Sequence, residues 1–305
     1  MLGYLPSIVG RGYAIRSSPD RLTISDVAGR RQIWLSRANA VYAHDVVTSF
    51  DYYFSAVEPF EQPTSAGGWR VVDYSSPRIH RVPGFPDFPV MFPSLAEPYQ
   101  TCEQYLEFAQ LRAGQTVLDL GCYAGLTAVA FSKAVTGSGR VISAEPDPVN
   151  FAVTAKNLDL HRRVNALGNI QVLPVAISDS EGTLAFSSEG SMGSSAVAIV
   201  GGYRGRVTEV PCVTLEGLLA RGGGDRVDFI KMDIEGAERA VIRGAGAFLR
   251  KHRPRIIIEP HVIEGNLTAD EVVANLTSYG YRCAIIKQFG VALPLVTAIP
   301  EPQPA

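Results

Sequence analysis

The stretch TVLDLGCYAG, residues 116–125, decides the fold of most of this chain. An apolar strand over 115–120 runs into a glycine-containing turn, and a helical pattern follows over 124–134. Because Gly121 and Gly125 have no Cβ, the backbone of this turn can approach a ligand closely. In open α/β folds, ligands bind at the carboxyl edge of the sheet, where such a turn lies. The turn therefore predicts a bound small molecule at that edge.

An acidic residue at the end of the strand narrows the class of ligand. The glycine spacing is G-x-x-x-G, which differs from the G-x-G-x-x-G of dinucleotide-binding turns. The carboxylate of Asp119 would repel a pyrophosphate, whereas it stabilises the ammonium and sulfonium groups of S-adenosylmethionine. We therefore expect S-adenosylmethionine to contact Asp119, Gly121, Tyr123 and Gly125 in this turn. A purely structural turn is the alternative.

Strand and helix patterns alternate through the rest of residues 99–298. Strands are predicted over 140–144, 170–177, 227–232, 255–259 and 281–287, and helices over 148–160, 237–249 and 269–279. This alternation predicts an α/β, Rossmann-like fold with a mixed, mostly parallel sheet and helices on both faces. Residues 178–210 are glycine-rich and interrupt the alternation, so we interpret them as a β-excursion or a loop near the strand ends.

Residues 1–98 are predicted to form an α+β extension that caps the substrate side. Residues 21–37 match two short strands around a turn at Ala28-Gly29, and residues 40–58 have helix-like apolar spacing. Residues 76–98 are rich in proline, which excludes a regular helix or a central strand. Their aromatic residues favour an ordered wrap or lid over a flexible linker.

Composition excludes several classes of protein. The chain has 28 basic and 30 acidic residues, so its net charge of −2 gives no drive toward nucleic acid. The four cysteines are far apart and form no C-x-x-C pair, which favours reduced thiols in the cytoplasm. We expect no secretion signal and no transmembrane helix, and a disordered tail over 299–305. A homo-oligomer is left open.

A second acidic position follows the strand over 140–144. Glu145 lies one βαβ unit beyond the glycine turn, where a carboxylate can accept two hydrogen bonds from a ribose diol. Pro146 follows it and is expected in the same cofactor contact. Asp147 precedes Pro148, a residue that suits a first helical turn, so Asp147 is expected to cap the next helix.

The end of the strand over 170–177 is a candidate adenine site. Ala176 and Ile177 are small or apolar, as residues that sandwich an adenine must be. Asp179 follows closely and could accept a hydrogen bond from the amino group of the adenine. A turn stabilised by its side chain is an equal alternative.

The stretch DFIKMDIEGAE, residues 228–238, places a lysine inside an apolar strand and acids at its end. A buried Lys231 requires a partner, and the nearby carboxylates can supply it. Asp233 should face the cleft, which makes it the first candidate for a catalytic and cofactor-contacting residue, with Glu235 the second. Glu238 is explained by the helix dipole, which favours acids in the first helical turn.

The strand over 255–259 ends in Glu259-Pro260-His261 at the same edge of the sheet. His261 is a candidate proton acceptor, and a hydrogen-bonded loop histidine is the alternative. Asp233, Glu259 and His261 could together hold a divalent ion. Nothing in their spacing requires a metal, so none is expected.

At these residues the chain resembles the FkbM-type methyltransferases. The similarity rests on TVLDLGCYAG (116–125), EPDP (145–148), VAISDSEGTL (175–184) and, most specifically, DFIKMDIEGAE (228–238) with IIIEPH (256–261). It implies a class I fold, S-adenosylmethionine as methyl donor, and cofactor contacts from the acids and glycines of the first two motifs. Cys122 departs from the small residues common in such turns, and we expect it to be tolerated.

The resemblance also implies O-methylation of a hydroxyl group on a sugar, a glycoconjugate or a polyketide-type natural product. Two other functions stay open from the residues alone. A NAD-dependent oxidoreductase would share the sheet and the glycine turn, although Asp119 argues against it. A cofactor-binding protein without catalytic activity would need none of the acids at 233, 235 and 238.

Overall fold

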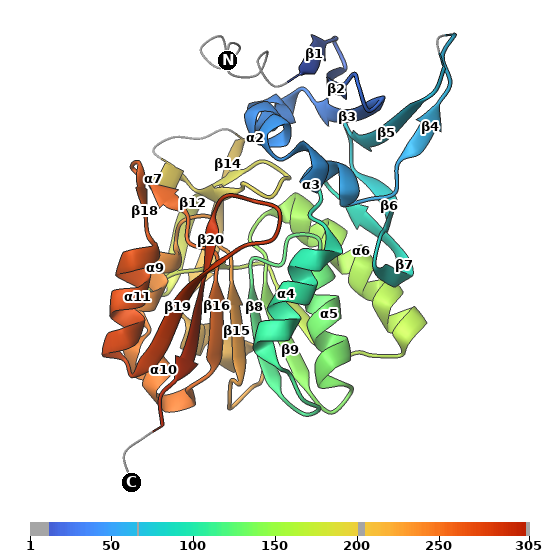
Figure 1. Cartoon of the computed structure of the whole chain (residues 1–305). Helices are drawn as coiled ribbons and strands as arrows, with labels where there is room; N and C mark the ends of the chain where they lie inside the picture. The colour runs from blue at the N-terminus through green and yellow to red at the C-terminus, as the bar shows by residue number, and fades with distance from the viewer. Residues whose placement is uncertain (1–11, 66, 201–204, 303–305) are drawn as a thin grey trace. The chain divides into compact units, whose positions relative to one another are not determined.

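The computed structural model describes residues 12–65, 67–200 and 205–302. The chain divides into two compact units, residues 1–100 and 101–305 (Figure 1). Expectations for residues 1–11, 201–204 and 303–305 lie outside the described residues. Each unit is built around its own sheets.

The first unit contains a five-stranded sheet with the order β1-β2-β3-β5-β4. The predicted strands over 21–37 are confirmed as β2 (Arg21–Asp26) and β3 (Arg31–Ser36), which pair antiparallel on either side of the predicted turn. The other three strands are β1 (Tyr13–Ser17), β4 (Phe60–Gln62) and β5 (Trp69–Tyr74), and β3 and β5 pair in parallel.

The helical pattern over 40–58 forms three short helices instead of one. They are η1 (Ala38–Tyr42), α2 (Ala43–Thr48) and α3 (Phe50–Ser55), and the chain leaves helical geometry at Ser49, where φ is −123°. The proline-rich segment is ordered, as expected, and contains the antiparallel pair β6 (Arg78–Val82) and β7 (Phe85–Phe92). Phe85, Phe88 and Phe92 are buried. The role of residues 1–98 as a substrate-side cap stays a prediction.

The second unit is built on a seven-stranded sheet with the order β10-β9-β8-β15-β16-β20-β19. The parallel strands are β8 (Thr116–Leu120), β9 (Arg140–Ala144), β10 (Ile170–Leu173), β15 (Phe229–Met232) and β16 (Arg255–Ile258). At one edge, β20 (Pro294–Pro300) pairs antiparallel with both β16 and β19 (Tyr281–Lys287). The sheet is therefore Rossmann-like, mixed and mostly parallel, as the alternation of strands and helices predicts.

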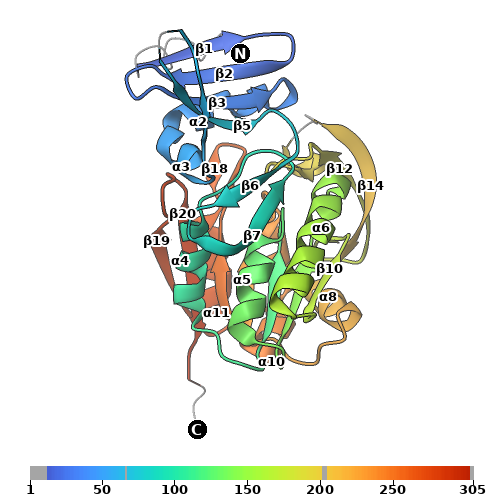
Figure 2. The same ribbon diagram turned by 90° about the vertical axis from the view of Figure 1, so that its right-hand side faces the viewer.

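Helices cover both faces of this sheet (Figures 1 and 2). Val117 and Phe229 pack in one core with α4 (Tyr99–Ala109) and α5 (Leu126–Val135), and α6 (Pro148–Asn165) lies beside α5. Leu118 and Ile230, one residue further along the same strands, face the other core. That core includes α8 (Leu215–Arg221), α9 (Glu238–Gly244), α10 (Gly246–His252) and α11 (Ala269–Ser278). Apolar residues on both faces explain why the strands appear as unbroken apolar runs.

Two predicted elements are each split in the structure. The strand over 170–177 divides at Pro174 into β10 and β11 (Ala176–Ile177), because proline cannot donate a hydrogen bond to the sheet. The helix over 237–249 divides at Ala245 into α9 and α10, where the flanking Gly244 and Gly246 weaken helical geometry.

The excursion predicted over 178–210 is a second sheet in the residues that the structure describes. Its order is β11-β14-β12-β13, with β12 (Gly182–Ser188), β13 (Ser195–Ala196) and β14 (Arg206–Val213). Helix α7 (Val197–Val200) follows β13 directly. The remaining short strands, β17 (Val262–Ile263) and β18 (Asn266–Leu267), form a hairpin after β16.

The carboxyl-terminal end of the chain differs from the prediction of a disordered tail over 299–305. Ile299 and Pro300 belong to β20, where Ile299 pairs with Arg282, and the backbone N–H of Glu301 donates to the Gly280 carbonyl at 2.9 Å. The apolar run before Pro300 supplies the buried face that makes this strand stable. No helix within the described ranges combines the length and hydrophobicity needed to cross a bilayer.

Candidate active site

The glycine turn between β8 and α5 is held in left-handed geometry. Gly121, Tyr123 and Gly125 have φ values of +76°, +51° and +80°. The N–H groups of Gly121 and Cys122 both donate to the Ala144 carbonyl, at 3.0 and 3.2 Å, which fastens the turn to the end of β9. Gly125 is the N-terminal cap of α5. The turn therefore lies at the carboxyl edge of two neighbouring strands, where the sequence predicts a ligand.

Asp119 and Lys231 lie buried beneath this turn. The Lys231 ammonium donates to the Gly121 carbonyl at 2.7 Å and to Asp233 Oδ2 at 3.4 Å, and it lies 3.9 Å from Asp119 Oδ1. The predicted carboxylate partner of Lys231 is thus confirmed. The Thr127 hydroxyl donates to Asp119 Oδ2 at 2.7 Å. Burial raises the pKa of Asp119, although the charge of Lys231 opposes this shift.

Glu145 is tied to the turn from the end of β9. Its Oε2 accepts the Tyr123 N–H at 2.9 Å, and its Oε1 accepts the Asp147 N–H at 3.0 Å. Burial raises the pKa of Glu145 to about 8. Pro146 lies half-buried between the two acids. Asp147 caps α6 by accepting the N–H groups of Val149 and Asn150, as predicted.

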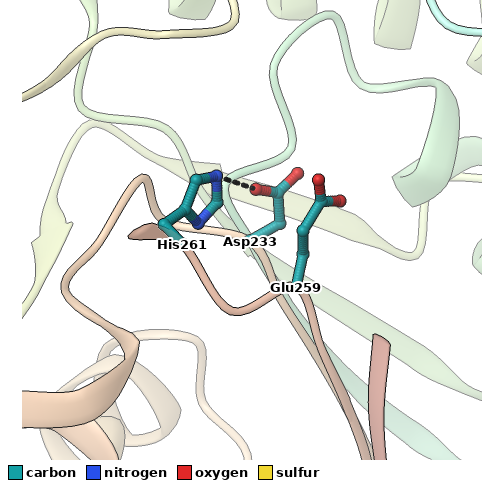
Figure 3. A group of neighbouring side chains, drawn as sticks. All are labelled: Asp233, Glu259 and His261. Atoms are coloured by element: carbon teal, nitrogen blue, oxygen red, sulfur yellow. Dashed lines mark ion pairs between the residues drawn. The ribbon is translucent and has the colours of Figure 1, made fainter. Parts of the chain in front are cut away.

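The acids after β15 converge on His261. His261 Nε2 lies 3.8 Å from Asp233 Oδ1 and 3.6 Å from Glu235 Oε2. Its Nδ1 lies 3.0 Å from Oε1 of Glu238. Figure 3 shows the imidazole of His261 directed at the carboxylate of Asp233, with Glu259 on the other side of Asp233. Side chains from the two strand ends thus form one charged cluster.

The environment of His261 does not fit the predicted role of proton acceptor. Burial alone would lower the pKa of His261, but the carboxylates of Glu235 and Glu238 raise it well above its usual value. A raised pKa favours the protonated imidazole, and a protonated imidazole cannot accept a proton. The geometry therefore favours the alternative of a hydrogen-bonded loop histidine, one that orients and stabilises nearby carboxylates.

The helix dipole explains only part of the role of Glu238. Its side chain is fully buried, and its Oε1 accepts the N–H groups of Ile234 and Gly236 at 3.0 and 3.2 Å in addition to its contact with His261. Glu238 thus shapes the loop that carries Asp233 and Glu235. Glu238 differs from an ordinary acid of a first helical turn because its side chain is buried and bonded to the loop backbone and to His261.

Glu259 faces Asp233 from the end of the neighbouring strand β16 (Figure 3). Its Oε2 accepts the amide of Gln288 at 2.8 Å and the hydroxyl of Tyr105 at 3.5 Å. The sequence pattern gives no sign of these two partners, because they come from a loop and a helix far away in the chain. They hold the Glu259 carboxylate in place from the side of α4 and β19.

Within residues 12–65, 67–200 and 205–302, the group that could hold a metal ion is Asp233, Glu259 and His261. One ligand atom from each lies within 4.8 Å of the others. Two carboxylates and one imidazole suit a divalent cation, with water or an acceptor hydroxyl completing its coordination. The same oxygens also suit direct hydrogen bonds from hydroxyl groups, so the donor set alone does not require a metal.

The candidate adenine residues follow Pro174, where β11 pairs with β14 of the second sheet, and their contact with the cofactor stays a prediction. Ile177 packs in the main core and Ala176 in the core of the second sheet. Asp179 is exposed, lies 3.8 Å from Arg243 and packs beside Gly244, at the end of α9 opposite to Glu238. Its side chain also accepts hydrogen bonds from the hydroxyls of its neighbours Ser178 and Ser180, at 3.4 and 3.3 Å.

Comparison with known proteins gives the chain its family. Residues 119–283, more than half of the chain, match the methyltransferase FkbM domain. This range includes all the expected catalytic and cofactor-binding residues. Among curated proteins, no match is found.

Several solved structures are similar to this chain. The methyltransferase FkbM from Methylobacillus flagellatus is 18% identical, with a TM-score of 0.48 over 65% of this chain and 47% of that one. The precorrin-6y C5,15-methyltransferase from Geobacter metallireducens is 12% identical, with a TM-score of 0.41 over 66% and 89%. A SAM-dependent methyltransferase from Aquifex aeolicus is 17% identical, with a TM-score of 0.39 over 65% and 88%.

The chain spans about half the length of the Methylobacillus protein. The family assignment rests on the domain match and on the glycine turn, the acids and the sheet order that the structure shows. On this basis the chain belongs to the FkbM methyltransferase family.

Proposed function

We propose that this chain is an S-adenosylmethionine-dependent O-methyltransferase that acts on a hydroxyl group of a sugar, a glycoconjugate or a natural product. The observation that carries the proposal is the pair of facing carboxylates, Asp233 and Glu259, at the ends of adjacent strands (Figure 3). They lie beside a glycine turn that has the features of a cofactor site. Carboxylate oxygens accept hydrogen bonds, and neighbouring hydroxyls of a sugar are suited to donate them.

The residues around the turn fit S-adenosylmethionine. Asp119 Oδ1 and Asn150 Oδ1 are buried and have no hydrogen-bond partner within the described part of the chain, so acceptors remain for donors of a ligand. Asp119, Gly121, Tyr123, Gly125 and Glu145 would hold the cofactor, with Glu145 on the ribose. When bound, S-adenosylmethionine supplies a methyl group activated on a sulfonium. The carboxyl groups of Asp119 and Glu145 lie around the glycine turn, and negative charge there favours the positive charge of the sulfonium.

Asp233 is proposed to accept the proton of the acceptor hydroxyl. An alcohol is a weak acid, so its oxygen becomes a better nucleophile when a base removes the proton as the new bond forms. Lys231 and His261 approach Asp233 from two sides and fix its orientation. Glu259 is proposed to hold the acceptor by a second hydrogen bond, which reduces the freedom of the reacting oxygen.

Two measurements test this proposal in sequence. S-adenosylhomocysteine is expected to raise the melting temperature of the purified chain and NADH is not, and the opposite result would support an oxidoreductase. Methyl-labelled S-adenosylmethionine is then offered with a panel of glycosides and polyols. Label in a product that resists alkaline hydrolysis indicates a methyl ether, whereas release as methanol indicates an ester and contradicts O-methylation of a hydroxyl. Binding without any transfer would support the non-catalytic alternative.

The same assay, run with a chelator, tests the expectation that no metal is needed. Asp233 already has two cationic neighbours in Lys231 and His261, so turnover is expected to stay within about twofold of the untreated rate. Loss of activity that Mg²⁺ or Mn²⁺ restores would assign a metal to Asp233, Glu259 and His261.

The pKa of Glu145 predicts how cofactor affinity depends on pH. In the free protein burial raises this pKa from 4.5 to about 8, so the carboxyl carries a proton over most of the range between these two values. Hydroxyls of a ribose donate to the ionised form, and binding must then release that proton. The dissociation constant for S-adenosylhomocysteine is therefore expected to fall as pH rises toward the raised pKa, by at most about tenfold per unit, and then to level off.

Calorimetry at several pH values checks this expectation. Glu145→Gln is the control, because the amide does not titrate and should bind weakly, with a flat profile from about pH 6 to about pH 8.5. A flat profile for the unmodified chain would show that Glu145 is not the ribose acid or is already ionised.

A further inference from the structure

We propose that Asp147 is a positioning residue that holds residues 188–195 as the nucleoside-side wall of the cofactor site. This inference rests on the proposed function, since it assumes that a nucleoside binds at Glu145. It assigns a role to a segment of the second sheet that no motif of the sequence distinguishes.

Asp147 makes more contacts than a helix cap requires. Its Oδ1 accepts the N–H groups of Val149 and Asn150, which is enough to cap α6. Its Oδ2 accepts the hydroxyls of Ser188 and Ser194, each at 2.7 Å, and the N–H of Gly190 at 3.0 Å. One carboxylate oxygen is thus committed to the 188–195 segment, and the whole side chain is buried. Figure 2 shows the β12 end of this segment beside the top of α6.

The segment connects the two halves of the proposed site. Asn150 donates to the Ser191 carbonyl at 3.0 Å, and the same amide lies 3.5 Å from Glu145 Oε1. At the other end, the Ser195 hydroxyl donates to the Glu235 carbonyl at 2.7 Å. Residues 188–195 therefore run from the ribose acid to the loop that carries Asp233. In this proposal a nucleoside bound at Glu145, with its sulfonium near Asp233, extends along this segment.

A buried acceptor at this wall points to a ligand. Asn150 is only 2% exposed, and its Oδ1 has no hydrogen-bond partner among the residues that the structure describes. An amide held by Ser191 and Glu145 but left with an unused oxygen suits a ligand with a hydroxyl or amine donor. Asp179, the residue predicted to contact the adenine, lies at the end of α9 opposite to Glu238. The 188–195 segment is therefore the better candidate for contact with the nucleoside.

The test removes the two hydroxyl bonds from the segment to Asp147 and leaves the helix cap and the Gly190 N–H bond intact. In Ser188→Ala/Ser194→Ala, the dissociation constants of S-adenosylhomocysteine and 5′-methylthioadenosine are both expected to rise about tenfold, because both share the nucleoside. The KM of the acceptor should change less than about twofold. Ser180→Ala is the matched control, since it removes a serine–aspartate bond near the start of the same sheet. Unchanged affinity in the double variant would overturn the proposal.

A measurement on the unmodified chain covers the case in which the double variant does not fold. Binding of S-adenosylhomocysteine should slow hydrogen exchange of the backbone amides over 188–195. If the ligand binds and these amides exchange as before, the wall lies elsewhere and the inference is wrong. If no S-adenosylhomocysteine binds at all, the proposed function itself fails, so the two failures are distinguishable.

Discussion

Asp233→Asn is expected to lower kcat about 10³-fold while the dissociation constant of S-adenosylhomocysteine changes less than about tenfold, since a positioned proton acceptor contributes roughly 10² to 10⁴ in rate. The amide has nearly the same size as the carboxylate and can still contact Lys231 and His261. It cannot take the proton of an acceptor hydroxyl. Steady-state kinetics with a saturating acceptor, combined with calorimetry on the cofactor product, separates the chemical step from binding.

Two comparisons sharpen this result. Asp270→Asn makes the same chemical change at an exposed position in the first turn of α11 and should leave kcat unaltered. His261→Gln should cost only about tenfold, because His261 acts through the orientation of Asp233. If Asp233→Asn keeps more than about a third of the kcat, or if Asp233→Ala combined with His261→Ala retains turnover, proton removal does not depend on this cluster.

How much of the fold a sequence reveals depends on whether the information is local. The strands around Leu118 and Ile230 are unbroken apolar runs, and their parallel arrangement follows from the helices between them. The strand β20 has an equally apolar face, yet the alternation did not predict it, and its last residues were expected in a disordered tail. Prolines at both of its ends interrupt the strand pattern. At Pro174 the apolar pattern predicts one strand where the structure has two. Apolar residues continue through it, but the missing N–H sends β10 and β11 into different sheets.

The candidate site shows the same limit. Strand ends identify Asp233, Glu259 and His261, because parallel strands bring their carboxyl ends to one edge. The partners that set the chemistry come from elsewhere in the chain. Glu238 reaches His261 across the loop, and Gln288 reaches Glu259 from after β19. The carboxylates of Glu235 and Glu238 raise the pKa of His261. The residue pattern alone therefore suggests a base, whereas these contacts favour the protonated imidazole.

The backbone of Gly121 lies close to the backbone of the loop that carries Asp233. A Cβ added to Gly121 would lie 1.8 Å from the Asp233 carbonyl oxygen, far inside van der Waals contact. The opposing atom belongs to the backbone and cannot rotate away, so either the turn or the Asp233 loop must move. Gly121 also has a φ of +76°, which an alanine adopts only at a cost of about 1–2 kcal/mol.

Gly121→Ala is therefore expected to lower the free energy of unfolding by about 4 kcal/mol and the melting temperature by roughly 10 °C. Activity should fall at least about 10³-fold even where the variant is folded, because a displaced Asp233 no longer meets the acceptor. Gly280→Ala separates the two causes, since Gly280 has a φ of +85° and nothing lies within 4 Å of the position that its added methyl group would take. Gly280→Ala should lower the free energy of unfolding only by the cost of a positive φ for alanine, about 1 kcal/mol, and should keep its activity. Thermal melts and steady-state kinetics of both variants check this prediction. If Gly121→Ala loses no more stability and activity than Gly280→Ala, the close approach of the turn to Asp233 does not position the proposed catalytic carboxylate.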